Sequence, residues 1–329
     1  MATEKSKTAN MKDVAALANV SVATVSRYLN GSLDRMSKAT AERIKDAINK
    51  LDYVPNSTAR QMKTKKSKMI AVVVSNIDDF FSTELFKGIS SMLESKGYIG
   101  VLFDSDSDPD REKAILRSIG SQMFDGLIIQ PINNPSEIQS SLRRTIPITV
   151  VDRELDGSPW PQVVTDNYDI SQKATKYFLK QGFKHVVVLT SDVNSARTRM
   201  ERYRGIESAA ESVEIVEVPE KSFNHADVSG RLRKALADSF ANSLVFCLKE
   251  RWLLEFIPNL VIEGVIDNVH TTATAFADTD IAHRLEPKFK LISQNPFLMG
   301  ADSAEMIIDL IVNDEATKEQ KLVVPAKFE

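Results

Sequence analysis

The spacing of hydrophobic residues divides this 329-residue chain into parts with different local structure. Between Met11 and Gly31, apolar residues recur at helical intervals in two short runs, separated by the polar corner Asn19-Val20-Ser21. A third run with helical spacing follows Ser37 and ends before Pro55, because the residue preceding a proline is pushed out of the helical region. The pattern predicts a small all-α head over residues 1–54.

The first two runs have the spacing of a helix-turn-helix. Ser21 can cap the second helix by accepting a backbone N–H, and Asn19 stands where the corner requires a positive φ. If Val25 and Leu29 face inward, the opposite side of the second helix is free to enter a major groove. An ordinary pair of amphipathic helices is the alternative. We expect DNA contacts from Ser21, Val22, Ala23, Thr24, Ser26, Arg27 and Asn30.

From residue 68 onward, short apolar strands alternate with amphipathic helices. The runs at 70–74, 126–129 and 148–151 are apolar on both faces, as is typical of buried parallel strands. A second series of strands and helices extends from about residue 163 to residue 276. The chain is therefore predicted to be α/β, with the helix-turn-helix head followed by two doubly wound parallel-sheet subdomains. Ligands of such folds bind at the carboxyl ends of the strands, here in the crevice between the subdomains.

The charge of the chain is distributed unevenly. Residues 1–66 contain 13 Lys and Arg against 6 Asp and Glu, a net +7, and the remaining residues carry −10, so that the whole chain has −3. A basic head favours binding to phosphates, whereas an acidic body does not. A solvated basic tail is the alternative, but such a tail has no reason to contain a helix-turn-helix.

Composition argues against several other classes of protein. No apolar run is long enough to span a membrane and no N-terminal export signal is present, so we expect a cytoplasmic protein without membrane contact. Cys247 is the single cysteine, and the four histidines at 185, 225, 270 and 283 lack metal-ligand spacing. The chain has no Gly-rich phosphate loop and no Gly-x-Ser-x-Gly elbow. We expect no metal, no cofactor and no enzymatic activity.

The head resembles that of the lactose-repressor (LacI/GalR) family of bacterial transcription regulators. The resemblance is carried by MKDVAALANVSVATVSRYLNG at residues 11–31 and YVPNSTARQMKTKKS at residues 53–67, with Asn19 where the family usually has Gly. It implies a hinge at 55–67 that becomes helical when two subunits lie on an operator, and it places Met62 where an apolar residue wedges into the minor groove. A buried contact with the body is the alternative for Met62. The resemblance adds Tyr53, Asn56, Arg60 and Met62 to the expected DNA contacts.

The resemblance extends over essentially the whole chain and implies a body like that of periplasmic sugar-binding proteins. It implies a body over residues 68–329, with an N-lobe of about 68–165 and 294–321 and a C-lobe of about 166–293 and 322–329. Two pocket segments depart from the family, because Lys249 stands where Asn is usual and Ala277 where Asp is usual. The effector pocket transferred from the family consists of Asp79, Phe80, Phe81, Arg153, Arg202, Lys249, Asp278 and Gln294.

These observations predict a homodimeric repressor of carbohydrate-use genes that binds double-stranded operator DNA and a small effector. We expect the effector to be a sugar, a sugar acid or a sugar phosphate, with Arg202 and Lys249 on an anionic group and Arg153 and Asp278 on hydroxyls. Alternatively, Lys249 pairs with Glu250 or a surface neighbour and never meets the effector. A regulator that has lost effector binding is a second hypothesis, and a sugar-modifying enzyme on this scaffold is a more remote one.

Overall fold

The computed structural model describes residues 9–34, 36–54, 66–239, 241–285, 288–313 and 320–328. The chain divides into two compact units, residues 1–66 and 67–329, which are treated separately below as the head and the body. Most of the expected hinge, including Asn56, Arg60 and Met62, lies outside the described residues. Within the described residues, no helix is long and apolar enough to cross a membrane.

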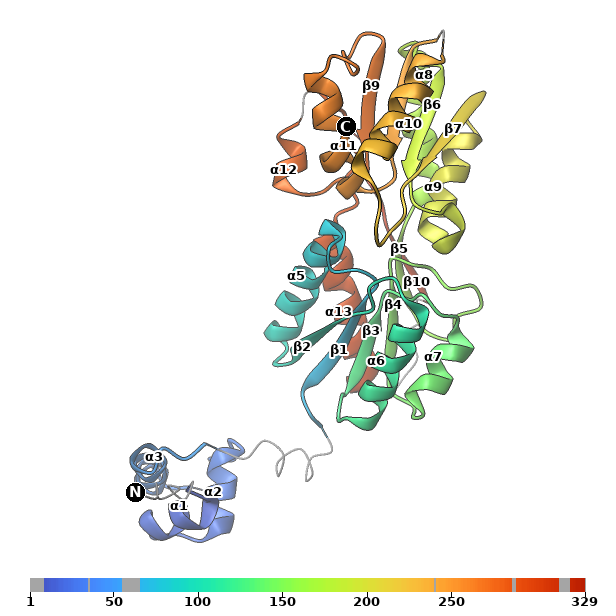
Figure 1. Cartoon of the computed structure of the whole chain (residues 1–329). Helices are drawn as coiled ribbons and strands as arrows, with labels where there is room; N and C mark the ends of the chain where they lie inside the picture. The colour runs from blue at the N-terminus through green and yellow to red at the C-terminus, as the bar shows by residue number, and fades with distance from the viewer. Residues whose placement is uncertain are drawn as a thin grey trace, which may run out of the picture. The chain divides into compact units, whose positions relative to one another are not determined.

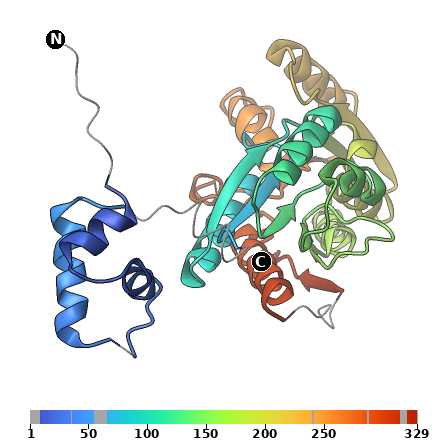
Figure 2. The same ribbon diagram turned by 90° about the horizontal axis from the view of Figure 1, so that it is seen from below.

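The described part of the head has three helices, α1 (Met11–Leu17), α2 (Val22–Leu29) and α3 (Lys38–Lys50), as the sequence predicted (Figures 1 and 2). Val14, Val25 and Ile44, one from each helix, are completely buried and form the centre of the head core. Burying one apolar stripe from each helix is what stabilises such short segments, which are marginal when isolated.

The turns of the head follow the predicted chemistry. Ser21 accepts a hydrogen bond from the backbone N–H of Thr24 at 3.1 Å, and Ser37 accepts one from Thr40 at 3.2 Å. Each hydroxyl therefore satisfies a donor that the first helical turn leaves unpaired. Asn19 has a φ of 53°, as the corner requires. The predicted cap and corner of the helix-turn-helix are confirmed.

The N-lobe of the body contains a six-stranded parallel sheet in the order β10-β5-β4-β3-β1-β2. Helices cover both faces of this sheet, which explains why its strands are apolar on both sides (Figure 1). Ile70 and Val72 of β1 pack against one helical layer and Ala71 and Val73 against the other. The strands are β1 (Met69–Val74), β2 (Ile99–Asp104), β3 (Gly126–Ile129), β4 (Ile148–Val151), β5 (Gln162–Thr165) and β10 (Lys321–Val324); the helices are α5 (Phe80–Ser95), α6 (Pro109–Ser121), α7 (Pro135–Leu142) and α13 (Pro296–Asn313).

The C-lobe repeats this architecture around a four-stranded parallel sheet in the order β7-β6-β8-β9. Val186 and Val188 of β6 pack against α8 and α9, and Val187 and Leu189 pack on the opposite face against α10 and α11. The elements are β6 (His185–Thr190), β7 (Ser212–Glu217), β8 (Ser243–Cys247), β9 (Thr271–Ala275), α8 (Asn167–Lys180), η1 (Val193–Ser195), α9 (Arg197–Glu207), α10 (His225–Ala237), α11 (Glu250–Ile262) and α12 (Asp280–His283).

Two features of the body differ from the sequence prediction. Strand β10 pairs with β5, so it belongs to the N-lobe, and the last crossing between lobes falls after Val324 rather than near residue 321. Beyond this crossing, Lys327 pairs with Ser293 and Phe328 enters the C-lobe core.

The second difference is helix α13. The sequence pattern assigned no helix between residues 295 and 319, where the structure has α13. Gly300 inside that segment weakens its helical propensity, but packing on α5 outweighs this loss.

Helices α5 and α13 approach each other closely through two glycines. A Cβ on Gly88 would collide with the backbone carbonyl oxygen of Phe297, and a Cβ on Gly300 would collide with that of Leu85. Because the obstacle is backbone in both cases, no side-chain rotation can relieve it. The absence of a side chain at these two positions therefore sets the distance between the helices.

We expect Gly88→Ala to lower the free energy of unfolding of the body by about 1–3 kcal/mol, the usual cost of overpacking. Gly230→Ala is the matched control, because nothing lies within 4 Å of a Cβ at that helical position. The control is expected to be more stable than the parent by about 0.5–1 kcal/mol. Denaturant unfolding followed by fluorescence measures both, since both tryptophans, Trp160 and Trp252, belong to the body. Equal stability of the two variants would contradict the packing argument.

Candidate functional site

The outward side of α2 presents the residues expected to read DNA. Val22 is 41% exposed, and Ala23 and Arg27 are also exposed, whereas Val25 is completely buried. Within the described residues, the Arg27 guanidinium makes no hydrogen bond or ion pair and keeps its donors free. Arginine is the side chain best suited to bind guanine through two hydrogen bonds. The expected contacts from this helix stay predictions, and their exposure is compatible with them.

Several polar residues of the predicted DNA-binding set are already engaged inside the head. The hydroxyls of Ser21 and Thr24 lie 2.9 Å apart, and the Asn30 amide donates to the Ser26 hydroxyl at 3.4 Å. Thr24 and Ser26 are half-buried, while Ser21 and Asn30 are exposed. These residues order the two ends of α2, whereas Arg27, in the last turn of the helix, keeps its long side chain free of hydrogen bonds within the described residues.

Tyr53 also has a place inside the head. The resemblance placed it among the DNA contacts, but its side chain is only 7% exposed and packs in the head core. Its backbone N–H donates to the carbonyl oxygen of Ile48 at 3.0 Å, which folds the end of α3 back over that core. Tyr53 therefore contributes to the stability of the head, and its contact with DNA stays a prediction.

The eight residues of the expected effector pocket line one cavity of about 60 Å³ in the body. Parallel strands of both lobes end there: Asp79 follows β1, Arg153 follows β4, Lys249 follows β8 and Asp278 follows β9. Their contact with an effector stays a prediction. The structure adds Gln130, Asp152, Thr198, Arg199, Glu250, Arg251 and Phe276 to the lining.

Arg202 is fixed in place by neighbours of the C-lobe. Its Nε donates to Asn167 Oδ1 at 2.8 Å and its Nη1 to the carbonyl oxygen of Leu248 at 2.6 Å, while the guanidinium lies 3.7 Å from the centre of the Phe276 ring. Burial lowers the pKa of Arg202 to about 10, so the group remains charged at neutral pH. Two donors are occupied, and only part of the guanidinium is available to a ligand.

The carboxylates of Asp278 and Glu250 stabilise the loops at the ends of the C-lobe strands. Asp278 accepts hydrogen bonds from the Ser293 hydroxyl at 2.7 Å and from the backbone N–H groups of Gln294 and Asn295. Burial raises the pKa of Asp278, while these hydrogen bonds oppose that shift. Glu250 accepts from the backbone N–H of Asp278 at 2.9 Å and from the Thr279 hydroxyl. Glu250 is therefore not the partner of Lys249.

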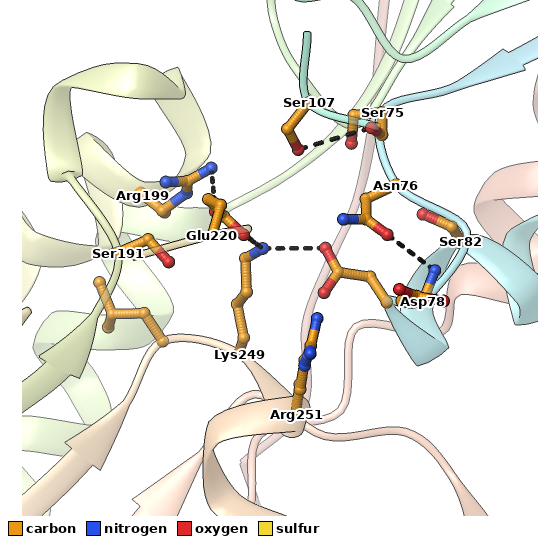
Figure 3. A network of polar contacts seen from close by, with 12 residues as sticks. Ser75, Asn76, Asp78, Ser82, Ser107, Ser191, Arg199, Glu220, Lys249 and Arg251 are labelled. Atoms are coloured by element: carbon orange, nitrogen blue, oxygen red, sulfur yellow. Dashed lines mark hydrogen bonds and ion pairs between the residues drawn. The ribbon is translucent and has the colours of Figure 1, made fainter. Parts of the chain in front are cut away.

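Lys249 instead extends between two other carboxylates, as Figure 3 shows. Its Nζ lies 2.9 Å from Asp79 and 3.0 Å from Glu220, and its side chain is only 13% exposed. Glu220 also accepts from Arg199 at 2.9 Å. Burial by itself raises the pKa of Glu220, but the charges of Lys249 and Arg199 outweigh it and hold that pKa below its ordinary value. The partner Glu250 and the surface position proposed in the alternative are wrong, whereas contact of Lys249 with an effector stays a prediction.

Arg199 and Glu220 were absent from the expected pocket. Arg199 lies one turn before Arg202 on α9, a spacing that places both side chains on the same side of the helix. That spacing was the available signal for Arg199. Glu220 follows β7 in a loop without periodicity, and no sequence signal points to it.

Arg153 differs from the other cations of the cavity. It is only 7% exposed, yet within the described residues its guanidinium has no hydrogen bond and no ion pair. The neighbouring carboxylate, Asp152, accepts from the Gln130 amide at 2.6 Å. Burial lowers the pKa of Arg153 and the nearby charge of Arg199 lowers it further, while the charges of Asp152, Asp79 and Glu220 oppose this shift. The Nε2 of Gln294 is also buried without a partner. The cavity thus presents hydrogen-bond donors that are not used within the described residues.

No group of His, Cys, Asp or Glu side chains in the described part of the chain could hold a metal ion.

Two family descriptions match the chain. "Bacterial regulatory proteins, lacI family" matches residues 10–56, and "Periplasmic binding proteins and sugar binding domain of LacI family" matches residues 66–240. Among curated proteins, the transcriptional regulator KdgR of Bacillus subtilis is 28% identical over 93% of this chain and 92% of its own length. RegA of Clostridium acetobutylicum is 36% identical over 53% of each chain.

Solved structures agree with these matches. A LacI transcriptional regulator from Lactobacillus brevis is 56% identical, with a TM-score of 0.76 over 79% of this chain and 99% of that one. The lac repressor dimer bound to operator is 19% identical, with a TM-score of 0.83 over 98% of this chain and 97% of that one. At that identity the second likeness shows the shared fold alone.

Arg27→Ala is expected to lower affinity for the specific DNA site by about 1–3 kcal/mol, because one bidentate base contact is lost. Affinity for unrelated DNA should change much less. Arg43→Ala is the matched control, since Arg43 is an exposed arginine of the same head but belongs to α3. Fluorescence anisotropy on a site selected from random DNA by the parent protein measures both variants. A loss of the same size on specific and unrelated DNA would show that Arg27 binds only phosphate.

Proposed function

This chain belongs to the LacI family of bacterial regulatory proteins, and on that premise we propose that it is a repressor of carbohydrate-use genes controlled by an anionic sugar derivative. Members of this family are DNA-binding transcriptional regulators with a sugar-binding domain.

The DNA-binding part of the proposal rests on the head. An exposed face with one free arginine lies on the second helix of a helix-turn-helix, in a unit whose net charge is +7. One such head reads only a few base pairs, so two heads in a homodimer supply the length of site that specificity needs. Met62 is proposed to enter the minor groove between the two half-sites.

The effector part rests on one observation, the buried and unpartnered guanidinium of Arg153. The charges of Asp152, Asp79 and Glu220 only partly offset the burial of this guanidinium, and a bound anion would offset it further. Arginine also presents donors in the planar arrangement that suits a carboxylate or phosphate. We therefore infer that the effector carries a carboxylate or a phosphate and places it on Arg153.

The structure changes the roles first expected for the pocket residues. Lys249 is already bound to Asp79 and Glu220, so the primary anion contact moves to Arg153. Gln294 Nε2 and Asp278 Oδ2, which have no hydrogen-bond partner within the described residues, are then available to sugar hydroxyls. Two similar solved structures hold neutral sugars, namely cellobiose in complex with the regulator CelR and ribose bound to a regulator from Enterococcus faecium. Binding of such a neutral sugar is the competing outcome here.

Operator binding is tested by selecting sites from random double-stranded DNA with the full chain. We expect an inverted repeat, because two-fold protein symmetry is mirrored in the DNA. Deleting one half-site should reduce affinity at least about tenfold, or about 1.4 kcal/mol, whereas altering the same number of flanking bases should not. Selection of single half-sites, with equal affinity for both probes, would contradict the dimeric repressor.

Effector class is tested by calorimetric titration with D-gluconate, D-glucose 6-phosphate and D-glucose. We expect at least one anion to bind about tenfold or more tightly than glucose, and Arg153→Gln to abolish that preference. Arg231→Gln is the control, because Arg231 is an exposed arginine of the C-lobe that pairs with Asp227. In the ligand-free protein, Arg153→Gln should leave stability unchanged or raise it, because no partner loses a hydrogen bond. Glucose binding that survives Arg153→Gln would overturn the anionic effector.

A further inference from the structure

Four charged side chains form a continuous chain across the cleft between the two lobes (Figure 3). Arg199 donates to Glu220 at 2.9 Å, Glu220 accepts from Lys249 at 3.0 Å, and Lys249 donates to Asp79 at 2.9 Å. Arg199, Glu220 and Lys249 belong to the C-lobe, whereas Asp79 precedes the first residue of α5 in the N-lobe. Two positive and two negative groups compensate each other, and the bond from Lys249 to Asp79 is the one that joins the lobes.

This bond is better shielded from solvent than the other ion pairs between the lobes. The side chains of Lys249 and Asp79 are 13% and 16% exposed. Those of Lys221 and Asp108, which pair between the lobes at 3.3 Å, are 54% and 38% exposed, and those of Arg197 and Glu154, which pair at 3.8 Å, are 37% and 17% exposed. Exposed pairs contribute little because water and salt screen them. Partly buried charges are screened much less, and breaking one leaves an uncompensated charge behind.

Lys249 also lines the cavity in which we place the effector. Asp79 lines the same cavity, so an effector that binds there lies directly beside the ion pair between Lys249 and Asp79.

We propose that Lys249 is a resident cation that holds the two lobes closed when no effector is bound. The lobes are joined by three chain crossings, an arrangement that permits rotation about a hinge, so their closure depends on contacts across the cleft. In most two-lobed binding proteins the ligand supplies these contacts. Here the chain supplies them through its own ammonium group.

The proposal has a consequence for the effector, and that consequence alone rests on the function proposed above. A ligand does not need to close the cleft, but it has to displace the Asp79 carboxylate from Lys249. The anionic group of the effector binds Arg153, and an effector hydroxyl takes the place of the Asp79 carboxylate on Lys249. The internal ion pair and the effector therefore compete for the same ammonium group.

Closure is measured on the full chain by energy transfer between one label in each lobe. Exposed Ser118 on α6 and exposed Lys234 on α10 are replaced by cysteine for labelling, and Cys247 does not interfere because it is completely buried. Labelled chains are mixed with an excess of unlabelled chains, so that transfer between subunits does not contribute. The variants are Lys249→Met, Asp79→Asn, their double mutant, and Lys221→Met as the matched control.

We expect one short distance in the ligand-free parent protein and a longer or broader distribution in Lys249→Met and Asp79→Asn. The double mutant should add nothing to either single mutant, because both break the same bond. Asp79→Asn is the safer variant for folding, since the Asp79 side chain makes no capping hydrogen bond to α5. Lys221→Met should keep the short distance. Unchanged distances in Lys249→Met and Asp79→Asn, or an equal effect of Lys221→Met, would overturn the proposal.

Titration with D-gluconate separates this proposal from the function proposed above. If the internal ion pair competes with the effector, Asp79→Asn binds gluconate more tightly than the parent protein does. If the cleft opens in both single mutants but no anion binds, the proposed role of Lys249 stands and the anionic effector is wrong. If the parent protein and Asp79→Asn bind gluconate equally tightly and the distance between the lobes does not change, the proposed role of Lys249 is wrong and the anionic effector stands.

Discussion

Two parallel sheets that direct their carboxyl ends at each other impose one constraint on this body: charged side chains from both lobes are buried in a single small space. Arg199, Lys249 and Asp79 each satisfy this constraint through an ion pair, and Arg202 satisfies it through an amide and a carbonyl oxygen. A buried charge without such a partner is costly. The organisation of the cleft follows from how these charges are shared.

The same constraint explains why Arg153 is informative. The carboxylates near it bind other groups. Asp152 accepts a hydrogen bond from Gln130, and Glu220 pairs with Lys249 and Arg199. A guanidinium that is buried, charged and unpaired stores unfavourable energy that a ligand of opposite charge can release. In the same cavity, therefore, the paired cation Lys249 stabilises a conformation, and the unpaired cation Arg153 is available for recognition.

Charge also separates the two units of the chain. The head has a net charge of +7 and the remainder −10, so attraction to DNA phosphates is confined to the unit that carries the exposed face of α2. Three short helices with one buried stripe each give the head a small core, to which Tyr53 contributes its ring. The ring of Tyr53 matters for that core, because a head of this size has few large side chains with which to fill it.

The sequence by itself determined the local structure, including the caps at Ser21 and Ser37, the positive φ of Asn19 and most strands to within a residue or two. These features depend on neighbours a few positions away, and resemblance to a family was enough to place eight residues around one cavity. Tertiary structure decided the rest: the pairing of β10 with β5, helix α13, the burial of Tyr53 and the partners of Lys249. Lys249 and Asp79 lie 170 positions apart, and no local pattern records which of several carboxylates a cation meets when two lobes pack together.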